Sequence, residues 1–500
     1  MEENLKIVHA KNFNKFNFGV NFNLLIDANA NVKTVLNVSS YVYDQKCECG
    51  NGKAIVSGKV GVKVLYLDTD NMTNIISDQQ SFSETYVENS ITTNTYLNLN
   101  SPTILNSVSL TDSGLKINCE ISFSPTSYIN LPLTSNLQNN SNLVTQKREY
   151  NSSCIKEIVN TKFEHTTNFE TRDIINKILC SESYFKAEKT TAENGYIVIQ
   201  GKLTNTILYE TNVDDCLVIK EMKETSNVQY DVELKNLISD DVLDLSFCVD
   251  NSLREISTEL EDDQNIITVK DTIKVCGIVL IKVSTEIIDD LYSLDNEIET
   301  SFITRELTKF VGEHTISETI SNEINLNSDE PAIDEVVANL NICPEITNTY
   351  VKDNNIIVEG VVSSNLTYID ENKELKHKTL EIPFIVDTKI KAENPSCVHS
   401  QISIVDTRVK IKRGTIIDVE YTVFINLFVY EKEEYQMLDN YNIGKQIDFS
   451  KYDYQIYIAK PDETLWQLCK RIKIAPNEIH KLNKDLPLVM KGGERVVIKR

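Results

Sequence analysis

The chain is poor in the residues that break or bend secondary structure. Its 500 residues include only 15 glycines, 10 prolines and 1 tryptophan, while isoleucine, valine, threonine, tyrosine and asparagine are abundant. β-Branched and aromatic residues favour strands over long helices. A chain of this length also exceeds one ordinary hydrophobic core. We therefore expect a mainly β, multidomain protein.

Export and membrane signals are missing as well. The N-terminal sequence MEENLKIVHAKN has no apolar core like that of a signal peptide. No later run approaches the roughly 18 uninterrupted apolar residues of a membrane span. The expectation is a protein made and kept in a cytoplasm, with no membrane span.

The cysteines lack the spacing of a disulfide framework or a zinc site. There are 11, an odd number, and no CxxC pair occurs. In a reducing compartment this pattern is typical of free thiols, most of them small apolar core residues. Cys47 and Cys49, beside Gly50 and Gly52 in an expected turn, have reactive or metal-binding thiols as the alternative. Two thiols do not complete a tetrahedral site, so no metal and no cofactor is expected.

The charge is strongly negative overall but changes sign near the end. The net charge is −24. Residues 451–500, which we call the tail, carry 11 Lys and Arg against 6 Asp and Glu. The preceding 450 residues, the body, carry 39 against 68. An acidic body repels phosphates, which argues against general nucleic-acid binding.

Three segments of the body share one pattern of an apolar run, a glycine and an alternating stretch that ends in tyrosine. In each segment the glycine and the tyrosine are eight residues apart. An apolar set upstream also recurs, at positions 32, 35 and 36, then 175, 178 and 179, then 333, 336 and 337. The body thus contains three copies of one unit. The segments are AIVSGKVGVKVLYLD (54–68, Gly58 and Tyr66), IVIQGKLTNTILYE (197–210, Gly201 and Tyr209) and IIVEGVVSSNLTYID (356–370, Gly360 and Tyr368).

Each copy is expected to begin with a turn or two of amphipathic helix, as in DIINKILC (173–180) and AIDEVVANLN (332–341). The glycine strand follows, and its glycine marks a bulge or a close backbone approach. Later strands complete each copy as an antiparallel sandwich or barrel-like repeat. Connectors are expected near 134–153, 320–332 and 439–453. The predicted domains are 1–133, 154–300, 301–440 and 453–500.

A repeated enzyme would be expected to keep a repeated catalytic set, and the sequence has none. The six histidines do not recur at matching offsets, and GxSxG, HExxH, P-loop and GxGxxG motifs do not occur. Three acidic copies in tandem therefore indicate a scaffold or adaptor that is not an enzyme. The basic strand TRVKIKRG (407–414) is interpreted as a solvated strand face, with an anion or partner contact as the alternative.

The tail has the pattern of a strand, two helices and a strand. YQIYIAKP predicts a short strand, and Glu463 and Thr464 suit the start of a helix. One apolar stripe follows, and Pro476 suits the first turn of a second helix. GGERVVIKR provides a turn and a closing strand. The stripe is Leu465, Leu468, Cys469 and Ile472, while Ile479 and Leu482 share a face of the second helix, which Asn483 can end.

These residues resemble the LysM family, whose pattern is approximately Y-x-V-x-x-G-D-T-L-W, a paired helix ending in L-N, and P-G-x-x-L-x-I. Thr464-Leu465-Trp466 matches T-L-W, Leu482-Asn483 matches L-N, and Gly493 and Ile498 match the last segment. The family's glycine-aspartate is Asp462-Glu463 here, and its proline is Gly492. The resemblance implies a small α+β domain of βααβ order.

LysM domains generally bind N-acetylglucosamine polymers through two loops at one end, and the altered loops here argue against sugar binding. We therefore predict a protein partner for the loops and first helix. Trp466 is interpreted as flanking the core, or alternatively as part of a recognition surface. The predicted partner-binding residues are Lys460, Asp462, Glu463, Thr464, Trp466, Asn483 and Lys491.

Repeated β-rich units followed by one C-terminal LysM-like module resemble the SipL-type spore coat morphogenetic proteins, whose repeated unit is the SPOCS domain. The resemblance implies a sporulation scaffold in the mother-cell cytoplasm at the forespore surface, within the spore coat. Its implied partners are the coat-assembly ATPase SpoIVA, bound through LysM, and other spore coat proteins. The alternatives are a wall-associated protein that binds peptidoglycan and a hydrolase with LysM as its anchor.

Overall fold

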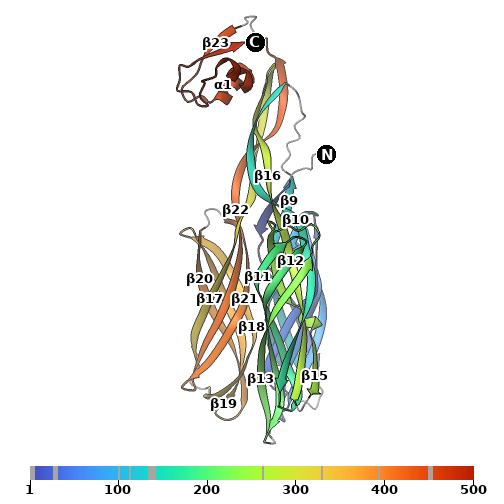
Figure 1. Cartoon of the computed structure of the whole chain (residues 1–500). Coiled ribbons are helices and arrows are strands. Elements are labelled where there is room, and N and C mark those ends of the chain that lie inside the picture. Colours follow the sequence, from blue (N-terminus) through green and yellow to red (C-terminus); the bar gives the residue numbers. More distant parts are fainter. Residues whose placement is uncertain are drawn as a thin grey trace.

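The fold is almost entirely made of strands. The computed structural model describes residues 6–25, 32–99, 102–111, 114–132, 142–214, 216–261, 264–327, 330–391, 395–448 and 454–499. Within these ranges the two α-helices both lie in the tail, and neither is long and apolar enough to cross a membrane. Figure 1 shows β-sheet bodies side by side, with a narrow ribbon of strands rising from them towards the tail. The prediction of a mainly β fold is confirmed.

Each copy contains one antiparallel three-stranded meander, with the glycine strand in its centre. The first copy has β3 (Val32–Gly50), β4 (Lys53–Asp68) and β5 (Thr73–Val87). The second has β11 (Ile175–Glu193), β12 (Tyr196–Val213) and β13 (Cys216–Glu233). The third has β18 (Ile333–Lys352), β19 (Asn355–Asp370) and β20 (Leu375–Lys391).

A second sheet packs against each meander across an apolar core, so that every copy is a sandwich. In the first copy it is split into β2 (Phe16–Leu25), β8 (Gly114–Phe123) and β7 (Thr103–Thr111), and β1 (Lys6–Asn12), β9 (Thr126–Pro132) and β6 (Tyr96–Asn98). In the second it contains β10 (Leu143–Thr171), β16 (Gln264–Ser293), β14 (Val242–Val249) and β15 (Glu255–Glu261). In the third it contains β17 (Asn296–Asn325), β22 (Ile416–Gln446) and β21 (Pro395–Lys412).

The prediction of a helix at the start of each copy is wrong, because these segments form the first residues of the strands β3, β11 and β18. At the start of β11 the register shifts twice, between Ile175 and Lys177 and between Ile178 and Cys180. β3 and β18 have register shifts at the corresponding places. A bulge inserts one residue and moves the following side chains to the other face. Two bulges three residues apart therefore change the spacing of the apolar residues from every second residue to every third or fourth. That spacing is typical of an amphipathic helix.

The predicted connectors are also wrong over much of their described length. Residues 143–153 belong to β10, 320–325 to β17 and 439–446 to β22, while 134–141, 328–329 and 449–453 lie outside the described residues. Their polar composition is compatible with strands because cross-strand hydrogen bonds satisfy the backbone whatever the side chains are. Two of these segments belong to the ribbon seen in Figure 1.

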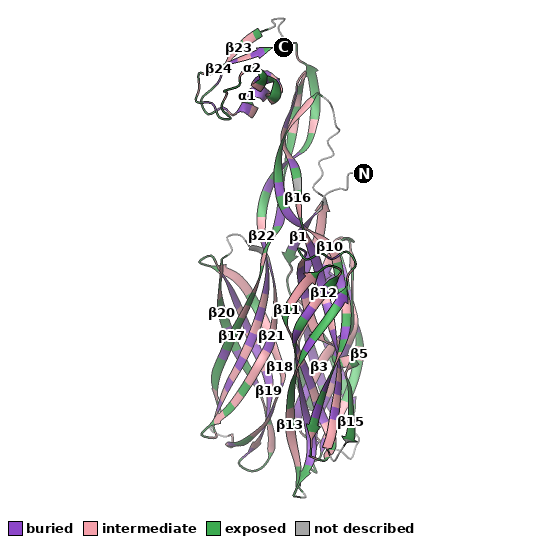
Figure 2. Ribbon diagram, viewed as in Figure 1, coloured by how far each residue is buried: buried purple, intermediate pink, exposed green. Residues whose placement is uncertain are grey.

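We call this ribbon the stalk: residues 143–153, 284–293, 296–307 and 433–446. Leu143 pairs with Ser293, and Asn296 pairs with Gln446, so the paired strands run to the far end of the stalk. Figure 2 shows many exposed residues along the stalk and buried residues throughout the sandwiches. At the base of the stalk one apolar cluster unites all three copies: Ile7, Tyr150, Ile287, Leu307, Tyr435 and Met437.

The three copies pack around shared apolar clusters. The start of each meander contributes to one of them, with Leu36 and Leu179 at equivalent positions and Leu340 from the third copy. The second sheets contribute to another, in which Tyr128 meets side chains of β16 and β22. Because both clusters draw on every copy, the body is one packed assembly and not a string of separate beads.

A buried carboxylate links the three copies at the second cluster. Asp244 in β14 accepts hydrogen bonds from the hydroxyls of Tyr128, at 2.7 Å, and Tyr430, at 2.9 Å. Its other oxygen lies 2.6 Å from Nδ1 of His399. All four side chains are buried. Since a buried carboxylate needs partners for its oxygens, this cluster fixes how the copies meet.

The three repeated glycines sit where two strands approach closely. A Cβ on Gly360 would lie 2.3 Å from the carbonyl oxygen of Glu345, and one on Gly201 would lie 2.3 Å from that of Lys186. At Gly58 the corresponding distance, to the carbonyl oxygen of Tyr43, is 3.0 Å. The prediction of a close backbone approach is confirmed at Gly201 and Gly360, where only glycine fits without a shift of the backbone.

Candidate functional site

The tail folds in the predicted order of strand, helix, helix and strand. β23 (Tyr454–Ile458) pairs with β24 (Arg495–Lys499), and α1 (Leu465–Ile472) and α2 (Pro476–Leu482) lie between them. The predicted apolar stripe of α1 is buried in full, together with Ile479 of α2, whereas Leu482 is 44% exposed. A single small core thus holds the two helices against the strand pair.

Local chemistry explains where the two helices begin and end. The Thr464 hydroxyl accepts a hydrogen bond from the Gln467 amide, and the Gln467 side chain accepts one from the Thr464 amide. This reciprocal pair is a capping box at the start of α1. Pro476 occupies the first turn of α2. Asn483 ends α2, and its side chain bonds both the amide and the carbonyl of Val497 in β24.

Of the predicted partner-binding residues, Glu463 is the most buried. It is 7% exposed and forms two 2.8 Å bonds with the guanidinium of Arg471. Burial raises the pKa of the Glu463 carboxyl, but Arg471 and the Lys460 amide outweigh it and hold the pKa below its usual value. Glu463, Thr464 and Asn483 are therefore engaged within the tail, and a partner contact for them stays a prediction.

Lys460, Asp462 and Lys491 lie exposed in two loops that meet at one end of the tail. The Asp462 amide donates to the carbonyl of Met490, and the Met490 amide donates to that of Glu463. These bonds bring the three exposed side chains to the same end of the tail, and a partner contact for them stays a prediction.

Trp466 lies apart from these loops and faces the stalk. Its indole Nε1 donates a 2.8 Å hydrogen bond to Asp290 of β16, and its ring centroid lies 5.0 Å from that of Tyr292. Lys470 of α1 also pairs with Asp290, at 2.6 Å. The Tyr292 hydroxyl donates to the carbonyl of Ile474, at 2.7 Å. The single tryptophan therefore sits in the contact that holds the tail to the stalk.

Sequence reasoning missed this contact. Asp290 and Tyr292 belong to the stretch DDLY (289–292) of the acidic body, far from the tail in sequence. The one signal in the sequence was the pair Asp289-Asp290, whose negative charge is opposite to the net positive charge of the tail. Without the register of β16 nothing indicated that these residues reach the tail. Part of the positive charge of the tail is thus neutralised by a carboxylate of the same chain, since Lys470 pairs with Asp290.

The strand pair of the tail presents an apolar and basic face to solvent. Tyr454, Ile456 and Ile458 are 61%, 64% and 54% exposed. Opposite Tyr454 and Ile458 stand Lys499 and Arg495. We call these five residues the outer face of the tail. Exposed apolar side chains gathered on one face mark an interaction surface.

Two other candidates from the sequence, the thiols of Cys47 and Cys49 and the basic strand, lie in the body. Cys47 and Cys49 lie in β3, where the hydrogen bond between their thiols raises the pKa of Cys47 and lowers that of Cys49. In the described ranges no group of three or more His, Cys, Asp and Glu side chains could hold a metal ion. In the segment 407–414, Arg408, Lys410 and Lys412 are exposed, as a solvated strand face requires, and the alternative of a partner contact stays a prediction.

Comparison with known proteins adds no relative. No family model, curated protein or solved structure matches this chain. The function is therefore argued from the residues and their geometry.

The contact of Trp466 with Asp290 predicts a clear spectroscopic change. Asp290→Asn removes the charge that holds both Trp466 and Lys470, so we expect the tail to detach part of the time and Trp466 to become more accessible. Acrylamide quenching of tryptophan fluorescence measures this directly, because Trp466 is the only tryptophan. Glu286→Gln is the control, since Glu286 pairs with Lys147 on the same stalk. Equal quenching in both variants would contradict the docking contact.

Proposed function

We propose that this protein is a non-enzymatic scaffold that presents its tail to a protein partner. The observation that carries the proposal is the exposed outer face of the tail. The tail itself lies at the upper end of the stalk, away from the sandwiches (Figure 1). The packed body supplies a rigid base, and the stalk separates the tail from the sandwiches. A partner can therefore reach the outer face without a clash with the body.

More specifically, we propose that the protein is a SipL-type spore coat protein. Its tail is then a LysM-like module, and its body consists of three SPOCS-like repeats. The partner is then the coat-assembly ATPase SpoIVA, and the protein acts in the mother-cell cytoplasm at the forespore surface. The order of elements in the tail and the equivalent bulges in β3, β11 and β18 support this form. So does the sign change in charge between body and tail.

A surface variant tests the role of the outer face. Ile456→Ser is expected to weaken binding of the purified coat-assembly ATPase about tenfold or more, because apolar residues at the centre of an interface carry most of the affinity. Ile456 is 64% exposed, so the fold should tolerate the change. Ile385→Ser is the matched control, since Ile385 is 71% exposed on the third copy. Equal loss in both variants, or in neither, would count against this surface.

A further inference from the structure

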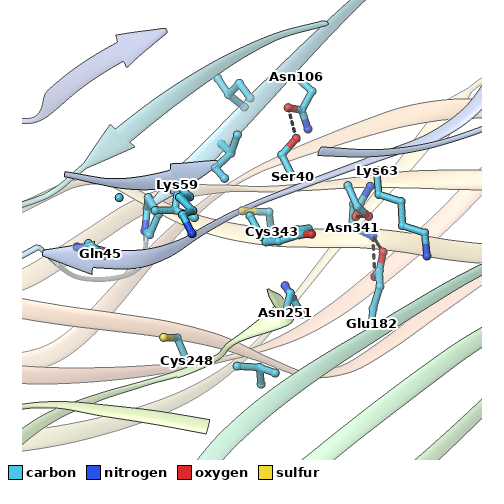
Figure 3. A pocket seen from close by; sticks show the side chains of 18 of the residues that line it. Ser40, Gln45, Lys59, Lys63, Asn106, Glu182, Cys248, Asn251, Asn341 and Cys343 are labelled. Atoms are coloured by element: carbon cyan, nitrogen blue, oxygen red, sulfur yellow. Dashed lines mark hydrogen bonds between the residues drawn. The ribbon is translucent and has the colours of Figure 1, made fainter. Parts of the chain in front are cut away.

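A large cavity lies between the three copies, away from the tail. Its volume is about 2100 Å³, and its walls include β3, β7, β11, β14, β18 and β20. Figure 3 shows side chains from several of these elements converging on it. Sites for single small molecules have volumes of about 300–1,000 Å³. This cavity therefore has room for a longer occupant.

Free strand edges border the cavity. β3 and β14 each stand at the end of their sheet, with one neighbour among the described strands. Every residue from Val35 to Val42 lines the cavity, and so does every residue from Ser246 to Val249. Successive side chains of a strand point to opposite faces, so an unbroken run means that the edge of the strand borders the space. On β3 the carbonyl of Val38 already accepts from the side chains of Asn341 and Asn106, so it is beyond Val38 that the edge offers backbone donors and acceptors to an extended peptide.

The lining is basic although the chain is acidic. Five Lys and Arg line the cavity against three Asp and Glu. One of the acids is Glu182, whose oxygens accept hydrogen bonds from the Asn341 amide and the Tyr184 hydroxyl. Within the part of the chain that the structure describes, Lys46 and Lys63 have no carboxylate within ion-pair distance, whereas Lys59 pairs with Asp44. Lys46 and Lys63 are thus the lining cations open to an acidic occupant, and Glu381 is a lining acid that forms no ion pair among the described residues.

One wall also holds buried donors without partners. Arg254, whose side chain is 7% exposed, bonds Asp271 at 2.7 Å and the carbonyl of Ser181 at 2.6 Å. Its Nη2, and the hydroxyl of Ser181, have no hydrogen-bond partner among the described residues. Both residues line the cavity. Leaving buried donors unpaired is unfavourable, and a carboxylate that came within reach of them would be a suitable acceptor.

The mouth of the cavity adds apolar side chains. Leu105, Val108 and Leu110 of β7 line it, with exposed fractions of 51%, 37% and 60%. A peptide in extended conformation places alternate side chains on opposite sides. Apolar residues on one side of such a peptide would meet β7, and acidic residues on the other would meet the basic wall.

We propose that this cavity binds an extended acidic peptide of a partner protein, which adds as a strand to the edge of β3. Charge complementarity selects the peptide, and its backbone completes the hydrogen bonds of the edge. This site is separate from the outer face of the tail, so the protein would have two contacts for partners. The proposal does not depend on the identity of the tail's partner.

The test uses the full chain and a fluorescein-labelled, acetylated and amidated octapeptide of alternating valine and glutamate. Fluorescence anisotropy is expected to show binding at least about tenfold tighter than for the matching valine-lysine peptide. Hydrogen exchange is expected to slow for amides of β3, and not for those of the stalk. A double variant with Lys46→Glu and Lys63→Glu is expected to bind the acidic and the basic peptide equally. The control Lys235→Glu, on an exposed turn, is expected to keep the preference for the acidic peptide.

Folding of the variants is checked by thermal melting, and Lys63→Gln replaces the double variant if that one fails to fold. Equal binding of the acidic and basic peptides would overturn the proposal. So would protection confined to regions other than β3. Binding of free citrate without binding of the acidic peptide would also overturn it, because the cavity would then be a site for small anions.

Discussion

Asp244→Ala is expected to destabilise the body by about 3–5 kcal/mol, the usual cost of breaking a buried, paired charge. Asp244 is 1% exposed and receives hydrogen bonds from Tyr128, of the first copy, and Tyr430, of the third. His399, also of the third copy, contacts its second oxygen. The substitution removes the acceptor that these side chains share and leaves a void between the copies.

Urea unfolding followed by circular dichroism measures this loss, and calorimetry adds a second readout. If Asp244 couples the copies, the parent should unfold in one cooperative transition and Asp244→Ala in more than one. Asp240→Ala is the matched control, because Asp240 is exposed in the same copy. Asp244→Asn keeps the side-chain volume and should fall between the two. An Asp244→Ala variant as stable as Asp240→Ala would contradict the linking role.

The second large effect is expected in the tail. Leu465 is 7% exposed in the small core shared by α1, α2 and the strand pair. Leu465→Ala removes buried methyl groups and leaves a cavity, which costs about 2–5 kcal/mol. A module of about 50 residues has little stability to spare, so we expect it to unfold.

Thermal melting followed by Trp466 fluorescence reports on the tail and on its contact with the stalk, since the body contains no tryptophan. Leu482→Ala is the matched control, because Leu482 is 44% exposed on α2. The body should melt as in the parent for both variants when followed by circular dichroism. If Leu465→Ala melted within a few degrees of Leu482→Ala, the packing of α1 described here would be wrong.

The tail could be predicted closely because its signals are local. The apolar stripe of α1, the hydroxyl of Thr464 and Pro476 each act within one or two helical turns. The alternation at Ile456 and Ile458 predicted a strand but not which face meets solvent. That depends on where the helices pack, and the structure exposes both isoleucines.

The body was predictable in its strand content, and less so in its details. Bulges near Ile175 and Ile178 gave a helical spacing to a strand, since a bulge is set by pairing with β12 and leaves no local mark. The link between copies has no sequence signal at all, because Asp244 lies 116 residues from Tyr128 and 186 from Tyr430. The docking of Trp466 on Asp290 spans 176 residues and was hidden for the same reason.

The central claim is that the tail is a module for a protein partner, presented by a rigid body. Isothermal titration of the full chain with the purified coat-assembly ATPase, and separately with N-acetylglucosamine oligomers, tests it most directly. The account predicts that the full chain binds the ATPase with a Kd of about 1 μM or tighter and does not bind the oligomers. A shortened chain that lacks the tail is expected not to bind the ATPase. Binding of the oligomers without binding of the ATPase would contradict it and place the protein with wall-associated glycan binders.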